Sequence, residues 1–300
     1  MCGIAGFVND MPIDVKCPVL QRMTDMIAHR GPDSEGHYID AHAALGHRRL
    51  SIIDLGGGQQ PIYNEDGSKV ITFNGEIYNY QTLREELIAA GHTFTTKSDT
   101  EVLLHGYEQW GVDLLQRVRG MFTFVIWDKN KQELFGARDH FGIKPFYYAK
   151  MNGTFMYASE IKSLLRHPDF VKELNAEALK PYMTFQYPAI GETFFKGVYK
   201  LPEGHYFTYR DGKMDIHRYY DEDFREGKQK LGELVNSIDQ TVPSRRTRSP
   251  MWRSAPSCRA VSTPATSPPW RVRSTRIRSV SAKARTTNRS RPANWRNCSN

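Results

Sequence analysis

Short apolar runs and amphipathic stretches alternate along the first 220 residues, which is the pattern of a mixed α+β domain. Runs rich in aromatic and β-branched residues predict strands, and they span residues 2–8, 69–79, 121–128, 133–139, 146–149, 154–159, 205–210 and 213–220. Short turns join most of these strands, and such turns connect antiparallel neighbours. Among them, Asn152-Gly153 and Asp211-Gly212 are predicted to be the turns of two hairpins. The pattern therefore predicts antiparallel sheets covered by helices.

Four stretches carry the 3.6-residue period of amphipathic helices. Pro18 suits the first position of the first helix, and Ser98 with Glu101 forms a capping-box pattern at the start of the third. The turn dipeptide Asn74-Gly75 is expected to break the strand predicted at 69–79. The helices are expected at residues 17–31, 80–91, 98–111 and 228–242.

Charge divides the chain into two parts of different character. Residues 241–300 hold 13 Arg, one Lys and no acidic residue, a charge of +14, whereas the first 240 residues carry −6. The Arg-, Ser- and Pro-rich end has no helical or strand period, so it is predicted to be a disordered basic tail. We expect a domain at 1–220, a linker and helix at 221–242, and the tail at 243–300.

Composition excludes several classes of protein. The four cysteines form no CxxC pair, so no metal site is predicted. No apolar run approaches the ~18 residues that a membrane span needs, and the start of the chain lacks the basic and apolar segments of a signal peptide. These features predict a cytoplasmic protein without a membrane partner.

The cysteine at position 2 is the first candidate for chemistry. If Met1 is removed, Cys2 carries a thiol and a free α-amine on the same residue. A thiol with a pKa near 8.5 is mostly protonated at neutral pH, and an α-amine that titrates near 7.7–8.0 can accept its proton. Cys2 is therefore a candidate nucleophile with a built-in base.

Six short motifs follow one another between Cys2 and Pro145. They are Cys2–Gly6, His29–Asp33, His47–Ile52, Phe73–Asn79, Ser98–Glu101 and Arg138–Pro145. Together they resemble class II glutamine amidotransferases, and specifically the glutamine-hydrolysing asparagine synthetases. The resemblance continues through Ala158–Lys162 and Lys200–Gly204 to about Val242.

The resemblance implies the α+β fold of the N-terminal-nucleophile hydrolases, a four-layer αββα sandwich of antiparallel sheets. It implies that Cys2 attacks the side-chain amide of glutamine, forms a thioester and releases ammonia. Asn74 and the backbone N–H of Gly75 would form the oxyanion hole. Arg49 would bind the α-carboxylate, and Asp99 and Glu76 the α-ammonium. The implied glutamine-binding residues are Arg49, Leu50, Ser51, Ile52, Ile53, Asn74, Gly75, Glu76 and Asp99.

The residue types alone leave other interpretations open at three of these places. Asn74-Gly75 is also a common turn. Asp99 suits the first turn of any helix, where the dipole favours a carboxylate. Arg49, beside two other basic residues, also fits a solvated strand edge.

Other residues of the motifs are given less prominent roles. His29 and His47 are candidates for acid–base catalysis, but the resemblance assigns that work to the α-amine of Cys2. Arg138 and Asp139 are interpreted as structural.

Asparagine synthetases pass the ammonia to a second domain that uses ATP and magnesium to activate aspartate. That domain opens with a Ser-Gly-Gly-x-Asp-Ser loop, whose N–H groups bind phosphate. The present sequence lacks this loop, so no cofactor is expected in the chain itself. Residues 257–266 can be encoded by codons whose shifted frame reads FLSGGVDSSY, which contains the loop. This compatibility suggests that the chain is out of frame from about Pro243.

The sequence therefore predicts a glutaminase of the asparagine synthetase type, which hydrolyses glutamine to glutamate and ammonia. Aspartate and ATP are expected as partners only of a full-length parent. A different class II amidotransferase is the second hypothesis. The third is an inert remnant, or a protein whose basic tail binds nucleic acid. We disfavour nucleic acid as a partner because few aromatic residues are interleaved in the tail.

Overall fold

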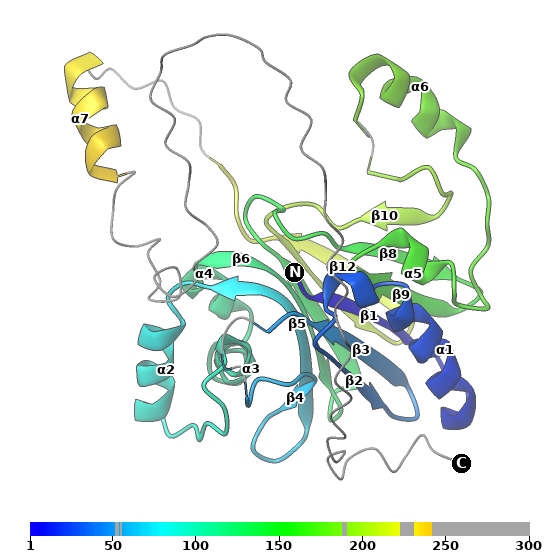
Figure 1. The fold of residues 1–300 in the computed structure, drawn as a ribbon, viewed down its shortest axis with the longest axis horizontal. Coiled ribbons are helices and arrows are strands. Elements are labelled where there is room, and N and C mark those ends of the chain that lie inside the picture. Colours follow the sequence, from blue (N-terminus) through cyan, green and yellow to red (C-terminus); the bar gives the residue numbers. More distant parts are fainter. Residues whose placement is uncertain (52–53, 55, 188–190, 223–230, 242–300) are drawn as a thin grey trace, which may run out of the picture.

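The computed structural model describes residues 1–51, 54, 56–187, 191–222 and 231–241. Two six-stranded sheets stack face to face, and helices cover the outer face of each (Figure 1). This is the predicted four-layer αββα sandwich of α+β class. In the described part of the chain, no helix is both long and apolar enough to cross a membrane.

The first sheet contains the start of the chain. β1 (Gly3–Val8) lies between two antiparallel neighbours, and its register puts Gly3 opposite Arg48. Cys2 therefore lies beside the end of the neighbouring strand, β3. The order of the sheet is β10-β8-β9-β1-β3-β2. Its other strands are β2 (Ser34–Ile39), β3 (Ala43–Arg49), β8 (Tyr147–Met151), β9 (Thr154–Ala158) and β10 (Val198–Lys200).

The second sheet has the order β12-β11-β7-β6-β5-β4. Its strands are β4 (Ile62–Tyr63), β5 (Lys69–Ile77), β6 (Gly120–Asp128), β7 (Glu133–Arg138), β11 (His205–Arg210) and β12 (Lys213–Arg218). Apolar side chains from both sheets, among them Ile4, Val125 and Trp127, fill the space between them and are buried. Each such side chain stabilises the sandwich by roughly 1.5–3 kcal/mol.

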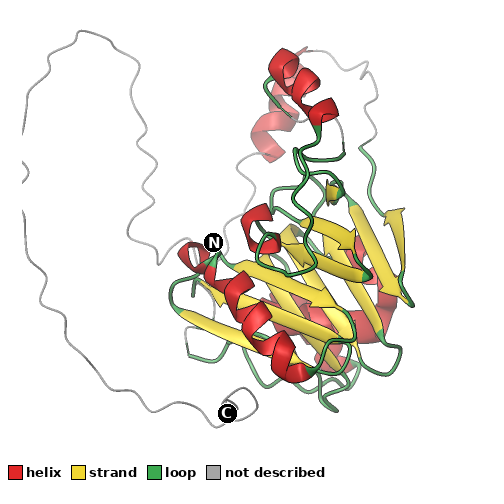
Figure 2. Cartoon of the chain, turned by 90° about the vertical axis from the view of Figure 1, so that its right-hand side faces the viewer, coloured by secondary structure: helices red, strands yellow, loops and turns green. Residues whose placement is uncertain are grey.

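Helices form the outer layers. The first sheet is covered by α1 (Ile13–Asp25) and α5 (Ile161–Leu164), with the 3₁₀ turn η1 (Ala28–Arg30) after α1. The second sheet is covered by α2 (Tyr80–Ala89), α3 (Asp99–Trp110), η2 (Gly111–Asp113) and α4 (Leu114–Arg117). Figure 2 shows α1 running across the first sheet, and in both views α6 (Ala176–Phe185) and α7 (Leu231–Thr241) stand away from the sandwich.

Two hairpins follow the predicted turn chemistry. Asn152-Gly153 joins β8 to β9, and Asp211-Gly212 joins β11 to β12. All four residues have positive φ, between 49° and 81°. A type I′ turn requires this conformation at both central positions, and Asn-Gly and Asp-Gly adopt it most readily.

The predicted start of the first helix is wrong. α1 begins at Ile13, so Pro18 lies inside the helix instead of at its first position. The side chain of Lys16 explains the earlier start. Its buried ammonium donates to the carbonyls of Asn9 and Ala41, at 2.7 Å each, and so fixes the first turn against the neighbouring loops.

The predicted break in β5 is also wrong, because the strand continues through Asn74 and Gly75 to Ile77. Gly75 serves close packing and not a turn. A Cβ at this position would overlap the backbone oxygen of Met121 on β6. Only glycine allows the two strands to pair at this spacing.

The capping box of α3 forms only in part. The Ser98 side chain caps the helix, but it accepts a hydrogen bond from Thr100 N, at 3.1 Å, and not from Glu101 N as in a capping box. The Glu101 carboxylate accepts hydrogen bonds from the backbone N–H groups of Thr95 and Thr96 instead, both at 2.7 Å. In a capping box this carboxylate would accept a hydrogen bond from the backbone N–H of Ser98. Here the loop before the helix supplies the donors instead.

The helix predicted at 228–242 is present as α7, Leu231–Thr241. Its apolar residues Leu231, Leu234, Val235 and Ile238 are exposed. The tail predicted to be disordered, at 243–300, lies outside the described residues.

Candidate functional site

Cys2 immediately precedes β1 and lies beside the chain that leaves β3. Its Sγ accepts a hydrogen bond from Leu50 N at 3.4 Å and lies 3.5 Å from Leu50 O. Burial raises the pKa of the Cys2 thiol, although the Leu50 N–H and the charge of Arg49 oppose that effect. A buried thiol of this kind needs a base before it acts as a nucleophile.

Arg30 fixes the backbone of Cys2. Its Nε donates to Cys2 O at 2.9 Å, and its Nη1 lies 3.0 Å from a carboxylate oxygen of Glu160. His29 contacts the same carboxylate at 2.9 Å, so it is engaged in this support. Neither Arg30 nor Glu160 was among the predicted site residues, although Arg30 belongs to the His29–Asp33 motif and Glu160 to Ala158–Lys162.

The implied carboxylate-binding residue, Arg49, ends β3. Its side chain is only 6% exposed, which excludes the solvated strand edge. Its Nη2 donates to Asp54 O at 2.6 Å, which directs the guanidinium toward the loop after β3. Ser51 N donates to the Asp33 carboxylate at 2.8 Å. The other two implied residues of this loop, Ile52 and Ile53, lie outside the described residues.

β5 carries three predicted site residues in succession, Asn74, Gly75 and Glu76. Asn74 is 1% exposed, and its Nδ2 has no hydrogen-bond partner among the described residues. An unpaired buried amide donor is costly, which makes Asn74 a candidate donor to a ligand. Burial raises the pKa of Glu76, and its Oε1 is likewise buried without a hydrogen-bond partner among those residues.

Asp99 is the first residue of α3 and is 5% exposed. Its Oδ2 accepts a hydrogen bond from Ile77 N at 3.0 Å, which ties the helix to the end of β5. Burial raises the pKa of Asp99 to about 6, and the nearby Glu76 carboxylate adds to that increase. The charges of both Asp99 and Arg49 reach the Cys2 thiol, so the fold gathers these residues although they lie far apart in sequence.

Lys144 is a buried cation at this site that the sequence analysis missed. Burial lowers its pKa, while the nearby Cys2 thiol and Glu76 carboxylate favour its charged form. Lys144 belongs to the Arg138–Pro145 motif, but nothing in the sequence indicates that residue 144 lies near residue 2 in space. The loop reaches Cys2 because Asp139 accepts hydrogen bonds from the N–H groups of Ile143 and Lys144.

His47 and Arg138 have structural roles. His47 is fully buried, with Nε2 3.0 Å from Phe73 O, and burial lowers its pKa to about 3. A neutral imidazole held in this way is a poor acid–base partner at neutral pH. Arg138 donates to the carbonyls of Lys144 and Leu201, at 2.8 and 2.6 Å, which agrees with its structural interpretation.

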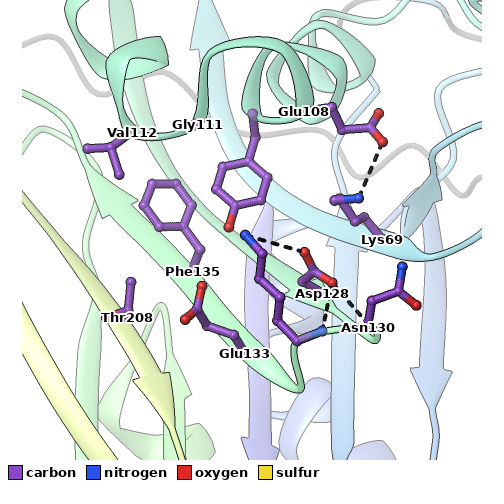
Figure 3. A pocket seen from close by; sticks show the side chains of 11 residues that line it. Lys69, Glu108, Gly111, Val112, Asp128, Asn130, Glu133, Phe135 and Thr208 are labelled. Carbon is purple, nitrogen blue, oxygen red and sulfur yellow. Dashed lines mark hydrogen bonds and ion pairs between the residues drawn. The ribbon is translucent and has the colours of Figure 1, made fainter.

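A pocket of about 570 Å³ opens over the outer face of the second sheet (Figure 3). Charged side chains that line it pair with each other: Lys69 lies 3.4 Å from Glu108, and Lys131 lies 3.9 Å from Asp128. Among the described lining residues, none belongs to the predicted site. This pocket is therefore separate from the chemistry at Cys2.

The chain is similar over most of its length to several named proteins. Asparagine synthetase [glutamine-hydrolyzing] 1 of Bacillus subtilis is 44% identical over 246 residues, which are 81% of this chain and 39% of that protein. Amidase chry2 of Gibberella zeae is 35% identical over 267 residues, which are 83% of this chain and 38% of that protein. The chain thus spans about two fifths of the length of these relatives.

Solved structures show the same fold at low sequence identity. The glutamine phosphoribosylpyrophosphate amidotransferase of Bacillus subtilis, complexed with ADP and GMP, matches with a TM-score of 0.56 at 18% identity. That match covers 74% of this chain and 50% of the other. The description of the glutamine amidotransferase domain family fits residues 1–220. The chain therefore belongs to the glutamine amidotransferase domain family, and the asparagine synthetases are among its relatives.

Proposed function

We propose that the Cys2 thiol attacks the side-chain amide of glutamine, so that a thioester forms and ammonia leaves. Water then hydrolyses the thioester to glutamate. The observation that carries this proposal is the buried Cys2 thiol, which lies within reach of the charges of both Arg49 and Asp99. The positive charge of Arg49 complements the α-carboxylate of a free amino acid, and the negative charge of Asp99 complements its α-ammonium.

The proposed base is the α-amine of Cys2, which becomes free only when Met1 is removed. Met1 is 57% exposed, so it is accessible to an aminopeptidase. The Arg30 bond to Cys2 O orients this residue. We expect the mature protein to lack Met1, and the mass of its N-terminal peptide checks that expectation.

The proposed oxyanion hole consists of Asn74 Nδ2 and the backbone N–H of Gly75. The support is the unpaired, buried Asn74 amide. A donor held in place before the reaction stabilises the negative oxygen of the tetrahedral intermediate without reorganisation. In this proposal Arg49 binds the α-carboxylate of glutamine, and Asp99 and Glu76 bind its α-ammonium. Backbone groups of Leu50, Ser51, Ile52 and Ile53 would complete the pocket.

The raised pKa of Asp99 gives a testable pH dependence. Only the ionised carboxylate attracts an α-ammonium, and the pKa of about 6 means that Asp99 becomes protonated below pH 6. We expect the Kd for glutamine, measured calorimetrically in the Cys2→Ala protein, to rise about tenfold per pH unit below 6. Asp99→Asn should bind weakly at every pH. An unchanged Kd between pH 7 and pH 5 would contradict this role.

The raised pKa of Asp99 also predicts how the stability of the protein depends on pH. An acid whose pKa is raised in the folded state stabilises that state only at low pH, and the contribution is lost as pH rises through about 4 to 6. The free energy of unfolding of Asp99→Asn at pH 7 should therefore be higher than that of the parent by roughly 1–3 kcal/mol. Urea unfolding at pH 7 and pH 4 measures this difference, which should vanish at pH 4.

The acceptor of the ammonia is proposed from the relatives. In a full-length parent, ammonia would be used with ATP and magnesium to convert aspartate to asparagine. This chain, without the phosphate-binding loop, is proposed to act only as a glutaminase. A cytoplasmic location is also proposed, because a catalytic thiol needs a reducing compartment.

A direct assay tests the proposed function. The purified chain should release glutamate and ammonia in equal amounts from glutamine, and should form no asparagine when aspartate, ATP and magnesium are added. Absence of ammonia release by protein that lacks Met1 would refute the glutaminase proposal. Formation of asparagine would refute the restriction to glutamine hydrolysis.

The proposed domain boundaries remain 1–220, 221–242 and 243–300. We also propose that the part after about Pro243 is read out of frame. Sequencing of the gene across this junction tests that proposal. An uninterrupted frame, with codons that do not encode the shifted loop, would end it.

A further inference from the structure

A second cluster of polar side chains lies on the outer side of the second sheet, away from Cys2. Glu65 comes from the β4–β5 loop, His92 follows α2, and His105 and Glu108 belong to α3. Each contributes one ligand atom, and these atoms all lie within 4.8 Å of one another. Three segments of the chain, of which α3 supplies two of the residues, therefore converge on one point.

The distances within the cluster match those between the ligands of one small cation. His92 Nδ1 lies 3.2 Å from Glu65 Oε1, and His105 Nδ1 lies 3.2 Å from Glu65 Oε2. The second carboxylate, of Glu108, places its Oε2 3.2 Å from the same His105 nitrogen. A tetrahedral zinc ion with bonds near 2.0–2.1 Å has ligand atoms about 3.3 Å apart.

The other ring nitrogen of His105, Nε2, is buried without a hydrogen-bond partner among the described residues, and the Glu101 carboxylate lies 3.6 Å from it. His92 has an outer partner, because its Nε2 lies 3.3 Å from the Gln109 side-chain oxygen. Histidines that bind metals almost always donate their other N–H to such a partner, which fixes the ring. The Nδ1 atoms of both histidines lie beside the carboxylates of the cluster.

The carboxylates are held in the same way. Glu108 Oε1 accepts from Asn64 Nδ2 at 2.7 Å and lies 3.4 Å from Lys69 Nζ, which leaves Oε2 for the cluster. Figure 3 shows the contact between Lys69 and Glu108. Glu65 Oε1 accepts from Thr93 N at 3.1 Å. His92 and both carboxylates of the cluster are thus oriented by neighbours outside it.

The donor set of the cluster also matches a divalent cation in charge. Two neutral imidazoles and two carboxylates would balance a divalent cation. Calcium and magnesium prefer oxygen ligands alone, whereas zinc accepts imidazole and carboxylate together.

We propose that Glu65, His92, His105 and Glu108 form a structural Zn²⁺ site. The ion would connect the β4–β5 loop and the start of the α2–α3 connection to the second half of α3. Since α3 begins at Asp99, the site would stabilise the helix that carries this residue of the glutaminase site. The proposal does not depend on glutamine hydrolysis, and its test uses a protein that cannot perform it.

Zinc titration of the full chain carrying Cys2→Ala tests this site without competition from the nucleophilic thiol. After removal of metals with a chelator, we expect one Zn²⁺ per chain and a higher unfolding midpoint with zinc. His92→Gln should weaken zinc binding by at least about 100-fold and abolish the shift in midpoint. Co²⁺ should give visible bands without a thiolate charge-transfer band.

The matched control is His42→Gln, because His42 also pairs with a carboxylate, that of Asp10 at 3.1 Å, outside the cluster. It should bind zinc as the parent does. If His92→Gln does not fold, Glu65→Gln replaces it, since Glu65 is exposed. The proposal would be overturned by binding of less than one zinc ion per chain or by a thiolate band with Co²⁺. Equal zinc affinity of the cluster variant and the parent would also overturn it.

Discussion

Cys2→Ala should reduce glutamine hydrolysis by at least about 10⁴-fold, because the thioester cannot form without the sulfur. The remaining groups of the site would still bind glutamine, so binding and chemistry separate in this variant. Ammonia release measured with a coupled assay gives the rate, and calorimetry gives the affinity. We expect the Kd of the variant to stay within a few-fold of the parental KM.

Chemical labelling gives an independent readout of the same prediction. A glutamine analogue with an electrophilic carbon in place of the amide should modify the N-terminal peptide of the parent and leave that of Cys2→Ala unmodified. Equal melting temperatures of the two proteins would exclude unfolding as the cause. Ammonia release by the variant at the parental rate would eliminate Cys2 as the nucleophile.

Asn74→Ala should lower kcat by about 10²- to 10³-fold with little effect on KM, because the lost donor acts on the tetrahedral intermediate more than on bound glutamine. The removal of an unpaired buried amide should cost little stability. Steady-state kinetics at saturating and limiting glutamine separates the two constants.

Thr72→Val is the matched control for this variant. Thr72 is buried on β5 two residues before Asn74, so it lies on the same face of the strand. It should retain the parental kcat. An Asn74 variant in which KM rises and kcat stays constant would assign the residue to substrate binding instead of the oxyanion hole.

The sequence predicts the elements of this fold well where the signal is local. The Asn152-Gly153 and Asp211-Gly212 turns were predicted because two adjacent residues determine the backbone conformation. The start of α1 was not, since it depends on the Lys16 ammonium and carbonyls up to 25 residues away. Likewise, Gly75 looks like a turn residue until Met121 of the neighbouring strand is placed against it.

The same distinction applies to the site. The resemblance named Cys2, Arg49 and Asp99 through motifs, and the structure brings their charges together. Lys144 and Arg30 were missed, because their importance comes from position in space. The residues of the proposed zinc site form no recognisable sequence motif. His105 and Glu108 share a helix face, but Glu65 and His92 reach them only through the packing of two loops.

The position of Cys2 directly before the central strand of the first sheet has a practical consequence. β1 pairs with β3 from Gly3 onward and with β9 from Ala5 onward, so the strand fixes the position at which Cys2 enters the site. An affinity tag or fusion partner attached at this end would keep the Cys2 nitrogen in a peptide bond and obstruct the thiol. Recombinant protein made in that form would be well folded and inactive, whereas a tag at the opposite end, or one cleaved to leave cysteine as the first residue, would preserve the nucleophile.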